Sequence, residues 1–300
     1  MTGIIAILVA ASATLGVYLL FGLGPTIGLI FLLGLALLVA VRRRLGSIVV
    51  FSVGAVYFIL PLFATLQWSF QARPPMAAYT NSLADPNFVG SLFYSFLVGV
   101  ITIVLSIALI VPTAYWVRLK APRLRPYVEF VTLLPFVIPP VILAFGLIRV
   151  YSRPPLPLTN ISFGSDLLLV AAYLVLSLPY MYRAVDTGLR SIDVRTLTEA
   201  AQSLGAGWFT ILWRVIFPNL RVALLSGAFL TLAIVIGEYT IGSFLSPKGF
   251  GPYLSLLGNS ATYEPAAVAI ISFALTWAAM GVILLVGRGS RSRVQLVGTH

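Results

Sequence analysis

The sequence predicts an all-α integral membrane protein, and three observations support this fold class. Of the 300 residues, 60% are hydrophobic, 9% are charged, and the mean hydropathy is +1.04. A soluble domain carries about 25% charged residues, so a surface this poor in charge predicts lipid as the solvent. The apolar residues form stretches of about 20, long enough to cross a bilayer as helices, and none has the short alternating pattern of a membrane barrel strand.

Eight segments satisfy this length requirement, and they set the predicted order of spans. They cover about residues 4–21, 24–41, 47–68, 88–117, 126–150, 165–185, 222–245 and 264–287. With this alternation, 15 of the 19 lysine and arginine residues fall on one side of the membrane. Positively charged loops mark the cytoplasmic side, so we expect both termini to be cytoplasmic.

The first two segments are predicted to form a membrane hairpin over residues 1–45. Gly22, Gly24 and Pro25 supply a tight turn between them. No lysine or arginine precedes Arg42, so the charged n-region of a secretory signal is missing. Between the third and fourth segments, residues 69–87 are polar and rich in turn formers. This external loop is either a docking surface or a simple connector.

The composition excludes several kinds of site. There is no cysteine, and the only histidine is the last residue, His300, so no disulfide, thiolate or histidine-based metal site is expected. The basic residues punctuate apolar segments and do not alternate with aromatic residues as in a nucleic-acid-binding surface. Hydrolase motifs and the G-x-x-x-x-G-K-[ST] nucleotide loop are absent from the sequence. We therefore expect no catalytic residue, no cofactor and no nucleic-acid partner.

The most informative segment is the predicted cytoplasmic loop at 186–221. Ser191 or Asp193 can cap a short helix from Val194 to Leu204. Gly205 suits the left-handed position after such a helix, and Gly207 adds a second break. A second short helix is expected over residues 208–217, with Pro218 ending or kinking it. The loop should therefore be two short amphipathic helices at the cytoplasmic face.

This loop resembles the EAA loop of type I ABC importer permeases. The resemblance is carried by Glu199-Ala200-Ala201, then Gly205, and then Val215-x-Phe217-Pro218 at the family spacing, with apolar replacements where the family has Ile-x-Leu-Pro. It implies a six-span permease core over residues 46–290, to which the 1–45 hairpin is added and after which 291–300 form a tail. It also implies that the loop couples the spans to a separate ATPase through Glu199, Ala200, Ala201, Gly205 and Pro218.

The same resemblance implies the partners and the location. The expected partners are an ABC ATPase dimer that binds ATP and Mg, a second permease subunit, an external substrate-binding protein and membrane lipid. The expected location is the bacterial inner membrane. The chain itself would then be a transporter subunit and not an enzyme.

Two polar or irregular features in the spans are candidates for the substrate pathway. Glu238 and Tyr239 fall inside the predicted 222–245 span, where an acid is costly and marks a pathway or a structural hydrogen bond to a neighbouring helix. Pro135, Pro139 and Pro140 must break or kink the 126–150 span, and irregular backbone is tolerated where it lines a cavity. Asp166 and Glu129, at span ends, are expected to be solvated.

The substrate group follows from the loop variant. The segment Glu199-Ala-Ala-Gln-Ser-Leu-Gly-Ala206 resembles the loops of spermidine/putrescine, iron(III), thiamine, aminophosphonate and oxyanion permeases. The proline-rich span and Gly237-Glu238-Tyr239 resemble the spermidine/putrescine group, which we therefore favour. A lone acid in the route would suit a cationic polyamine. A proton-coupled secondary transporter using Glu238 is the alternative, although no internal repeat of the kind common in such transporters is visible.

Overall fold

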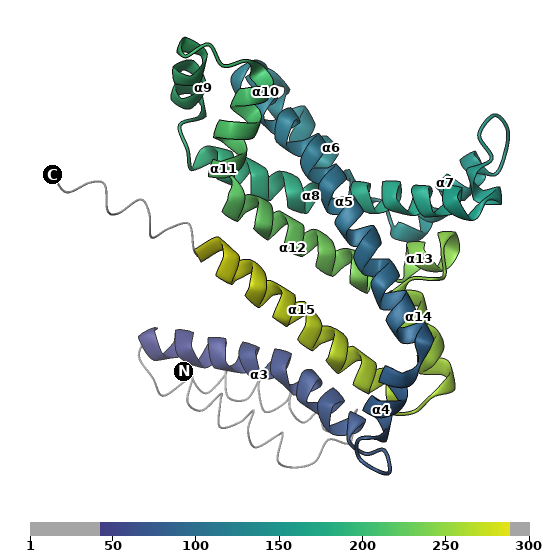
Figure 1. Ribbon diagram of the computed structural model, residues 1–300. Coiled ribbons are helices and arrows are strands. Elements are labelled where there is room, and N and C mark those ends of the chain that lie inside the picture. Colours follow the sequence, from purple (N-terminus) through teal and green to yellow (C-terminus); the bar gives the residue numbers. More distant parts are fainter. Residues whose placement is uncertain (1–42, 289–300) are drawn as a thin grey trace, which may run out of the picture. The chain divides into compact units, whose positions relative to one another are not determined.

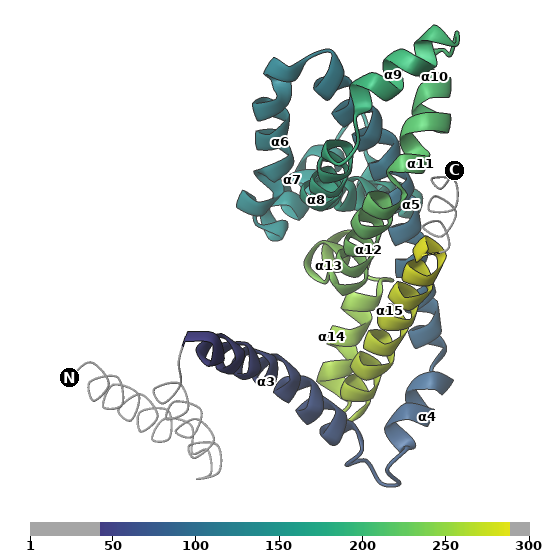
Figure 2. The same cartoon turned by 90° about the vertical axis from the view of Figure 1, so that its left-hand side faces the viewer.

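The computed structural model describes residues 43–288, and every regular element in that range is a helix (Figures 1 and 2). The chain divides into two units, Met1–Trp68 and Ser69–His300. In the first unit the described element is α3 (Arg43–Ser69), whose Val50–Ser69 stretch is apolar and long enough to cross a membrane. The predicted hairpin at 1–45 and the tail at 291–300 lie essentially outside the described residues.

The second unit contains four long helices and several short ones. The long helices are α5 (Pro86–Leu119), α8 (Ser162–Arg190), α12 (Arg221–Gly237) and α15 (Glu264–Arg288). The shorter elements are α4 (Ala77–Ala84), α6 (Arg125–Val137), α7 (Pro140–Tyr151), α9 (Val194–Ser203), α10 (Trp208–Ile211), a π-helical segment (Leu212–Ile216), α11 (Phe217–Asn219), α13 (Thr240–Leu245) and α14 (Phe250–Ser260). Single 3-10 turns lie at Pro122–Leu124 and Leu158–Asn160.

Helices α5, α8 and α12 pack against one another and form the centre of this unit. Glycines allow the close approach. A β-carbon at Gly227 would lie 2.7 Å from the sulfur of Met181, and one at Gly99 would lie 2.7 Å from Leu232 Cδ1. Small residues at helix crossings are the usual way for membrane helices to gain packing contacts, because lipid supplies no hydrophobic drive between them.

Three described helical stretches are long and apolar enough to span a membrane, and five if each bent helix pair counts as one span. Besides Val50–Ser69 these are α5 and α8, which match the predicted spans at 88–117 and 165–185. Within α15, the residues Glu264–Ala278 form a shorter apolar helical stretch. The described residues thus support a helical membrane protein, while the prediction of eight spans with cytoplasmic termini stays a prediction.

The predicted 126–150 span is broken, as its prolines require. Helix α6 ends at Val137, Ile138 and Pro139 are extended, and α7 begins at Pro140, with a bend of 97° between the two pieces. Pro139 and Pro140 each lack a backbone N–H, so the α-helical ladder cannot continue through them.

The predicted helix over 222–245 is wrong in one respect. Helix α12 ends at Gly237, Glu238 is extended with φ −76° and ψ 121°, and a separate short helix, α13, follows. Hydropathy does not register such a break, because Ile241, Phe244 and Leu245 keep the segment apolar. A second bend, of 78°, separates the 208–219 helical segment from α12.

The external loop at 69–87 contains a helix that was not predicted. Helix α4 occupies Ala77–Ala84, and Asp85 then caps α5 by accepting a hydrogen bond from the backbone N–H of Asn87 at 2.8 Å. That N–H and the hydroxyl of Tyr253 hold the pKa of Asp85 below its ordinary value. Pro86 at the first helical position completes a standard helix start.

Candidate functional site

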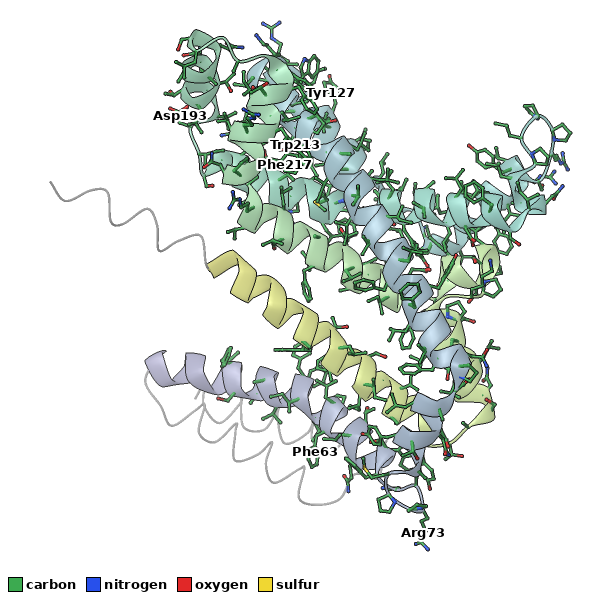
Figure 3. All side chains as sticks on the ribbon, viewed as in Figure 1. Phe63, Arg73, Tyr127, Asp193, Trp213 and Phe217 are labelled. Carbon is green, nitrogen blue, oxygen red and sulfur yellow. The ribbon has the colours of Figure 1, made fainter. Side chains whose placement is uncertain are left out.

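The start of α9 is built by its capping residue. Asp193 Oδ1 accepts from the backbone N–H of Thr196 at 3.2 Å, and Oδ2 accepts from the Thr196 hydroxyl at 2.7 Å. Asp193, and not Ser191, is therefore the cap. The pKa of the exposed Asp193 carboxyl lies below its ordinary value, because the Thr196 hydroxyl and, to a smaller extent, the Thr196 N–H donate to it. Figure 3 labels Asp193 at this helix start, with Trp213 and Phe217 on the neighbouring helical segment.

The end of α9 has the predicted glycine geometry. Gly205 has φ +78°, the left-handed region that favours glycine. Its N–H donates to Gln202 O at 2.9 Å, and the N–H of Ala206 donates to Ala201 O at 3.0 Å, which satisfies carbonyls at the helix end. A β-carbon at Gly205 would meet no atom within 4 Å, so only the backbone conformation constrains this position.

Helix α9 has an inner and an outer face. Val194 and Thr198 are buried, and Ala201 packs against the same apolar cluster. Arg195 and Glu199 are exposed and form an ion pair at 2.8 Å, four residues apart. Such an exposed pair contributes little to stability. Glu199 and Ala200 therefore lie on the outer face, where another protein could reach them.

Two of the predicted coupling residues do not share that outer face. Ala201 is half-buried against the core, and Pro218 lies in α11, half-buried, one turn before the bend into α12. Pro218 does not itself end the helix, which continues to Asn219. Both residues can shape the loop, but only Glu199, Ala200 and Gly205 are on its exposed side.

Leu204 is a residue that the sequence analysis missed. It sits at the end of α9 directly before Gly205, and 87% of its surface is exposed. Leu204 follows the inner-face residue Ala201 by three positions, a spacing that would place it on the same face if the helix continued. It is exposed because α9 ends at Ser203, so sequence periodicity alone would not have identified it.

A groove of about 850 Å³ runs beside α9. It is lined on one side by Asp193, Arg195, Glu199 and Gln202, and on the other by the end of α5 and the turn after it, including Arg118 and Lys120. The loop between α5 and α6 thus lies alongside the first helix of the 186–221 loop, which places basic and acidic side chains together at one end of the unit.

Glu238, the acid predicted for the pathway, serves as a structural acceptor. Its carboxylate accepts from the N–H of Ile241 at 2.9 Å, from the N–H of Gly242 at 3.0 Å and from the Tyr173 hydroxyl at 3.1 Å. The two N–H groups belong to the first turn of α13, where they have no partner within the helix, and the hydroxyl belongs to α8. Glu238 therefore holds the break between α12 and α13 and joins it to α8, which is the structural interpretation left open above.

The neighbouring pathway candidates are only partly brought together. Tyr239 is half exposed beside Glu238. Helix α7 packs against α13, with the rings of Phe145 and Phe244 4.8 Å apart. Pro135 is buried inside α6, whereas Pro139 and Pro140 are exposed at the α6–α7 bend. The broken span after Pro140 thus reaches the region of Glu238 through the contact between α7 and α13.

Asp166 and Glu129 are not simply solvated as predicted. Asp166 Oδ1 accepts from the Tyr94 hydroxyl at 2.6 Å and from the Ser246 hydroxyl at 2.7 Å, and Lys248 Nζ lies 3.4 Å from Oδ2. This network joins α5, α8 and the residues after α13. At the other end, Glu129 pairs with Arg125, and Arg125 also pairs with Asp186 of α8. Residues far apart in sequence supply these partners, except that Arg125 lies only four residues before Glu129 in α6.

Within the described residues, no group of three or more histidine, cysteine or acidic side chains could hold a metal ion.

Comparison with known proteins places this architecture among transport proteins. Residues 109–289 match the family described as binding-protein-dependent transport system inner membrane component. The chain is 29% identical over 178 residues to the sulfate transport system permease protein CysW of Synechococcus elongatus, and the match covers 57% of this chain and 62% of that protein. It is 30% identical over 149 residues to the molybdenum transport system permease protein ModB of Azotobacter vinelandii, covering 47% and 65%. The chain thus spans less than two thirds of the length of these relatives.

A solved structure shares the fold. A chain of a bacterial ABC transporter involved in import of the acidic polysaccharide alginate aligns with a TM-score of 0.56 and 22% identity, covering 84% of this chain and 99% of that one.

Proposed function

The chain belongs to the family of binding-protein-dependent transport system inner membrane components, and from that premise we propose that it forms half of the translocation pathway of an ABC importer. Its spans would line the route together with a second permease subunit. A separate ATPase dimer would bind ATP and Mg and supply the energy, and an external binding protein would deliver the substrate. The bacterial inner membrane is the proposed location.

The observation that carries this proposal is the two-sided build of α9. The inner face is fixed to the core by Val194 and Thr198, while the outer face presents Glu199, Ala200 and the exposed Leu204 to a partner. Such an exposed apolar side chain at a helix end is available to fill an apolar pocket on a partner protein. Movement of a docked partner would then be transmitted to the spans as a rigid-body shift.

The coupling assignment is tested by capturing the subunit from detergent-solubilised membranes and identifying co-purified proteins by mass spectrometry. We expect the unsubstituted chain to bring down an ATPase and a second permease. Leu204→Asp should lose the ATPase, because it places a charge where an apolar contact is proposed. Leu83→Asp is the matched control, since Leu83 is also exposed but lies on α4. Equal recovery of ATPase with both variants would reject α9 as the docking element.

For the substrate, an inorganic oxyanion is favoured over a polyamine. Relatives named for sulfate and molybdenum transport support this choice. The carboxylate of Glu238, which suggested a cationic substrate, is held by two backbone N–H groups and a hydroxyl, so its presence is explained without a cation. Uptake of labelled sulfate, molybdate and spermidine by cells with and without the subunit separates these classes, and uptake of spermidine alone would restore the polyamine prediction.

Glu238 was also the motivation for the proton-coupled alternative. Its hydrogen bonds to the first turn of α13 and to Tyr173 give this acid a structural role, so a proton relay is not needed to explain it.

A further inference from the structure

A buried hydrogen bond ties α9 to α5. The Tyr115 hydroxyl lies 3.0 Å from Thr198 Oγ1, with Tyr115 3% exposed and Thr198 6% exposed. Tyr115 belongs to the last turns of α5, and Thr198 is the residue before Glu199 in the centre of α9. The contact therefore reaches the proposed coupling helix from behind, on the face opposite to its exposed side.

The direction of this hydrogen bond follows from counting protons. The Thr198 hydroxyl also lies 2.7 Å from Val194 O and donates to that carbonyl, which accepts only. A threonine hydroxyl has a single hydrogen, so Thr198 can only accept from Tyr115. Tyr115 is thus the donor to Thr198, and Thr198 is the donor to Val194 O, so both buried hydroxyl hydrogens have an acceptor.

A hydrogen bond here does what the surrounding apolar contacts do not. Tyr115 and α9 otherwise meet through an apolar cluster that includes Val185, Leu189, Val194 and Ile211. Apolar burial is non-directional and tolerates sliding, whereas a hydrogen bond weakens steeply with distance and angle. The Tyr115–Thr198 bond therefore fixes the rotation and register of α9 on α5.

Helix α5 connects this bond with the opposite end of the unit. It has 34 residues, about 50 Å at 1.5 Å per residue, and runs between the α9–α10 end and the α4–α14 end (Figures 1 and 2). At its far end Tyr94 donates to Asp166, and Ser95 Oγ accepts from the N–H of Phe250. One helix thus carries polar contacts to the coupling loop and to the region of α13 and α14.

We propose that Tyr115 is a positioning residue that passes movement of α9 into α5 through its hydrogen bond to Thr198. The inference rests on the proposed function, because it concerns how an ATPase docked on α9 would act on the far end of the unit. The covalent routes from α9 run through the 191–193 turn into α8 and through α10 and α11 into α12, and Tyr115 adds a non-covalent route into α5.

The test uses the subunit co-purified with its ATPase and reconstituted in lipid. Because the chain has no cysteine, a single Gly90→Cys substitution near the far end of α5 supplies the only thiol of this subunit. The position is exposed, and a β-carbon there would meet no atom within 4 Å. The rate of its reaction with a fluorescent maleimide is measured on the separated permease band, with and without ATP plus vanadate.

We expect ATP and vanadate to change this rate, and Tyr115→Phe and Thr198→Val each to reduce the change about two- to tenfold, the factor that one neutral hydrogen bond supports in an equilibrium. The double variant should be no worse than either single one, because both remove the same bond. Thr198→Ser should keep the response.

Ser106→Ala is the matched control. Ser106 and Ser177 form the same kind of buried hydroxyl pair, at 2.7 Å, between α5 and α8, with the Ser177 hydroxyl also donating within its own helix. The inference is overturned if Ser106→Ala and Tyr115→Phe lose the response equally, if the losses of Tyr115→Phe and Thr198→Val add, or if Tyr115→Phe responds like the unsubstituted chain. It is also overturned if the maleimide reaction rate of Gly90→Cys does not change with ATP and vanadate while the ATPase is bound. Absence of any bound ATPase would refute the proposed function together with this inference.

Discussion

Glu238 shows at the residue scale how an intramembrane acid can be structural. It replaces the carbonyls missing before α13 by accepting two backbone N–H groups, and it adds a hydroxyl from α8. The tight fit continues on the other side, because a β-carbon at Gly251 would collide with the Glu238 carbonyl. A break in a span is tolerated only when its polar backbone groups find partners in this way.

This role predicts a specific mutational pattern. Glu238→Ala leaves the N–H groups of Ile241 and Gly242 and the Tyr173 hydroxyl without their acceptor, so we expect a loss of about 1–3 kcal/mol in unfolding free energy. Glu238→Gln keeps one acceptor oxygen and should lose less than half of that. Thermal unfolding of the purified protein in detergent measures both.

Transport separates the structural role from the proton relay. With the structural role, Glu238→Gln should still support substrate uptake. Complete loss of uptake in Glu238→Gln with unchanged thermal stability would instead favour the relay.

Helix α9 is the element whose ends the amino-acid sequence specifies best. Asp193, one of the two predicted caps, starts it, and Gly205, with φ +78°, follows its end as predicted. Local hydrogen bonding decides these ends, because a cap and a left-handed glycine act over three or four residues. The second half of the loop was less predictable, since its π-helical segment over Leu212–Ile216 depends on how the helix packs on the core.

The cap predicts a pH dependence for α9. The pKa of Asp193 is lowered from its ordinary value of 3.8 by hydrogen bonds from Thr196. A lowered folded-state pKa means that the cap contributes fully above that ordinary value and is lost as the pH falls through the lowered one. Amide exchange of residues 194–203, corrected for intrinsic rates, should therefore be constant from about pH 5 to 8 and increase under stronger acid.

Variants at the same position check this prediction. Asp193→Ala should increase exchange at the start of α9 at neutral pH, and Asp193→Ser, which retains a capping oxygen, should increase it less. Exchange in Asp193→Ala indistinguishable from the unsubstituted chain would show that the cap does not stabilise this helix.

At the scale of the whole molecule, the second unit has two chemically different ends. Basic residues, the ion pairs between α6 and α8, and the α9 helix gather at one end, and α4 and α14 lie at the other (Figures 1 and 2). The excess of lysine and arginine predicts that the α9 end faces the cytoplasm.

The absence of cysteine makes this orientation testable with single introduced thiols. Ser203 on α9 and Ser152 after α7 are both exposed. A membrane-impermeant maleimide applied to intact cells should label Ser152→Cys, and it should label Ser203→Cys only after the membrane is opened. The reverse pattern would invert the orientation, and labelling of both thiols from outside would contradict a membrane between them.

The amino-acid sequence by itself determined the helical membrane class, the ends of α9, the break at Pro139 and Pro140, and the loop that carries the family resemblance. These features depend on local chemistry or on summed hydropathy, which need no knowledge of neighbours. Only the tertiary structure decided that Glu238 caps a new helix, that Asp166 joins Tyr94 and Ser246, and that Tyr115 holds Thr198. Each of these hydroxyls and carboxylates is satisfied by a partner on another helix, many residues away in several cases, and an acid or a tyrosine looks the same in sequence whether it finds such a partner or faces water.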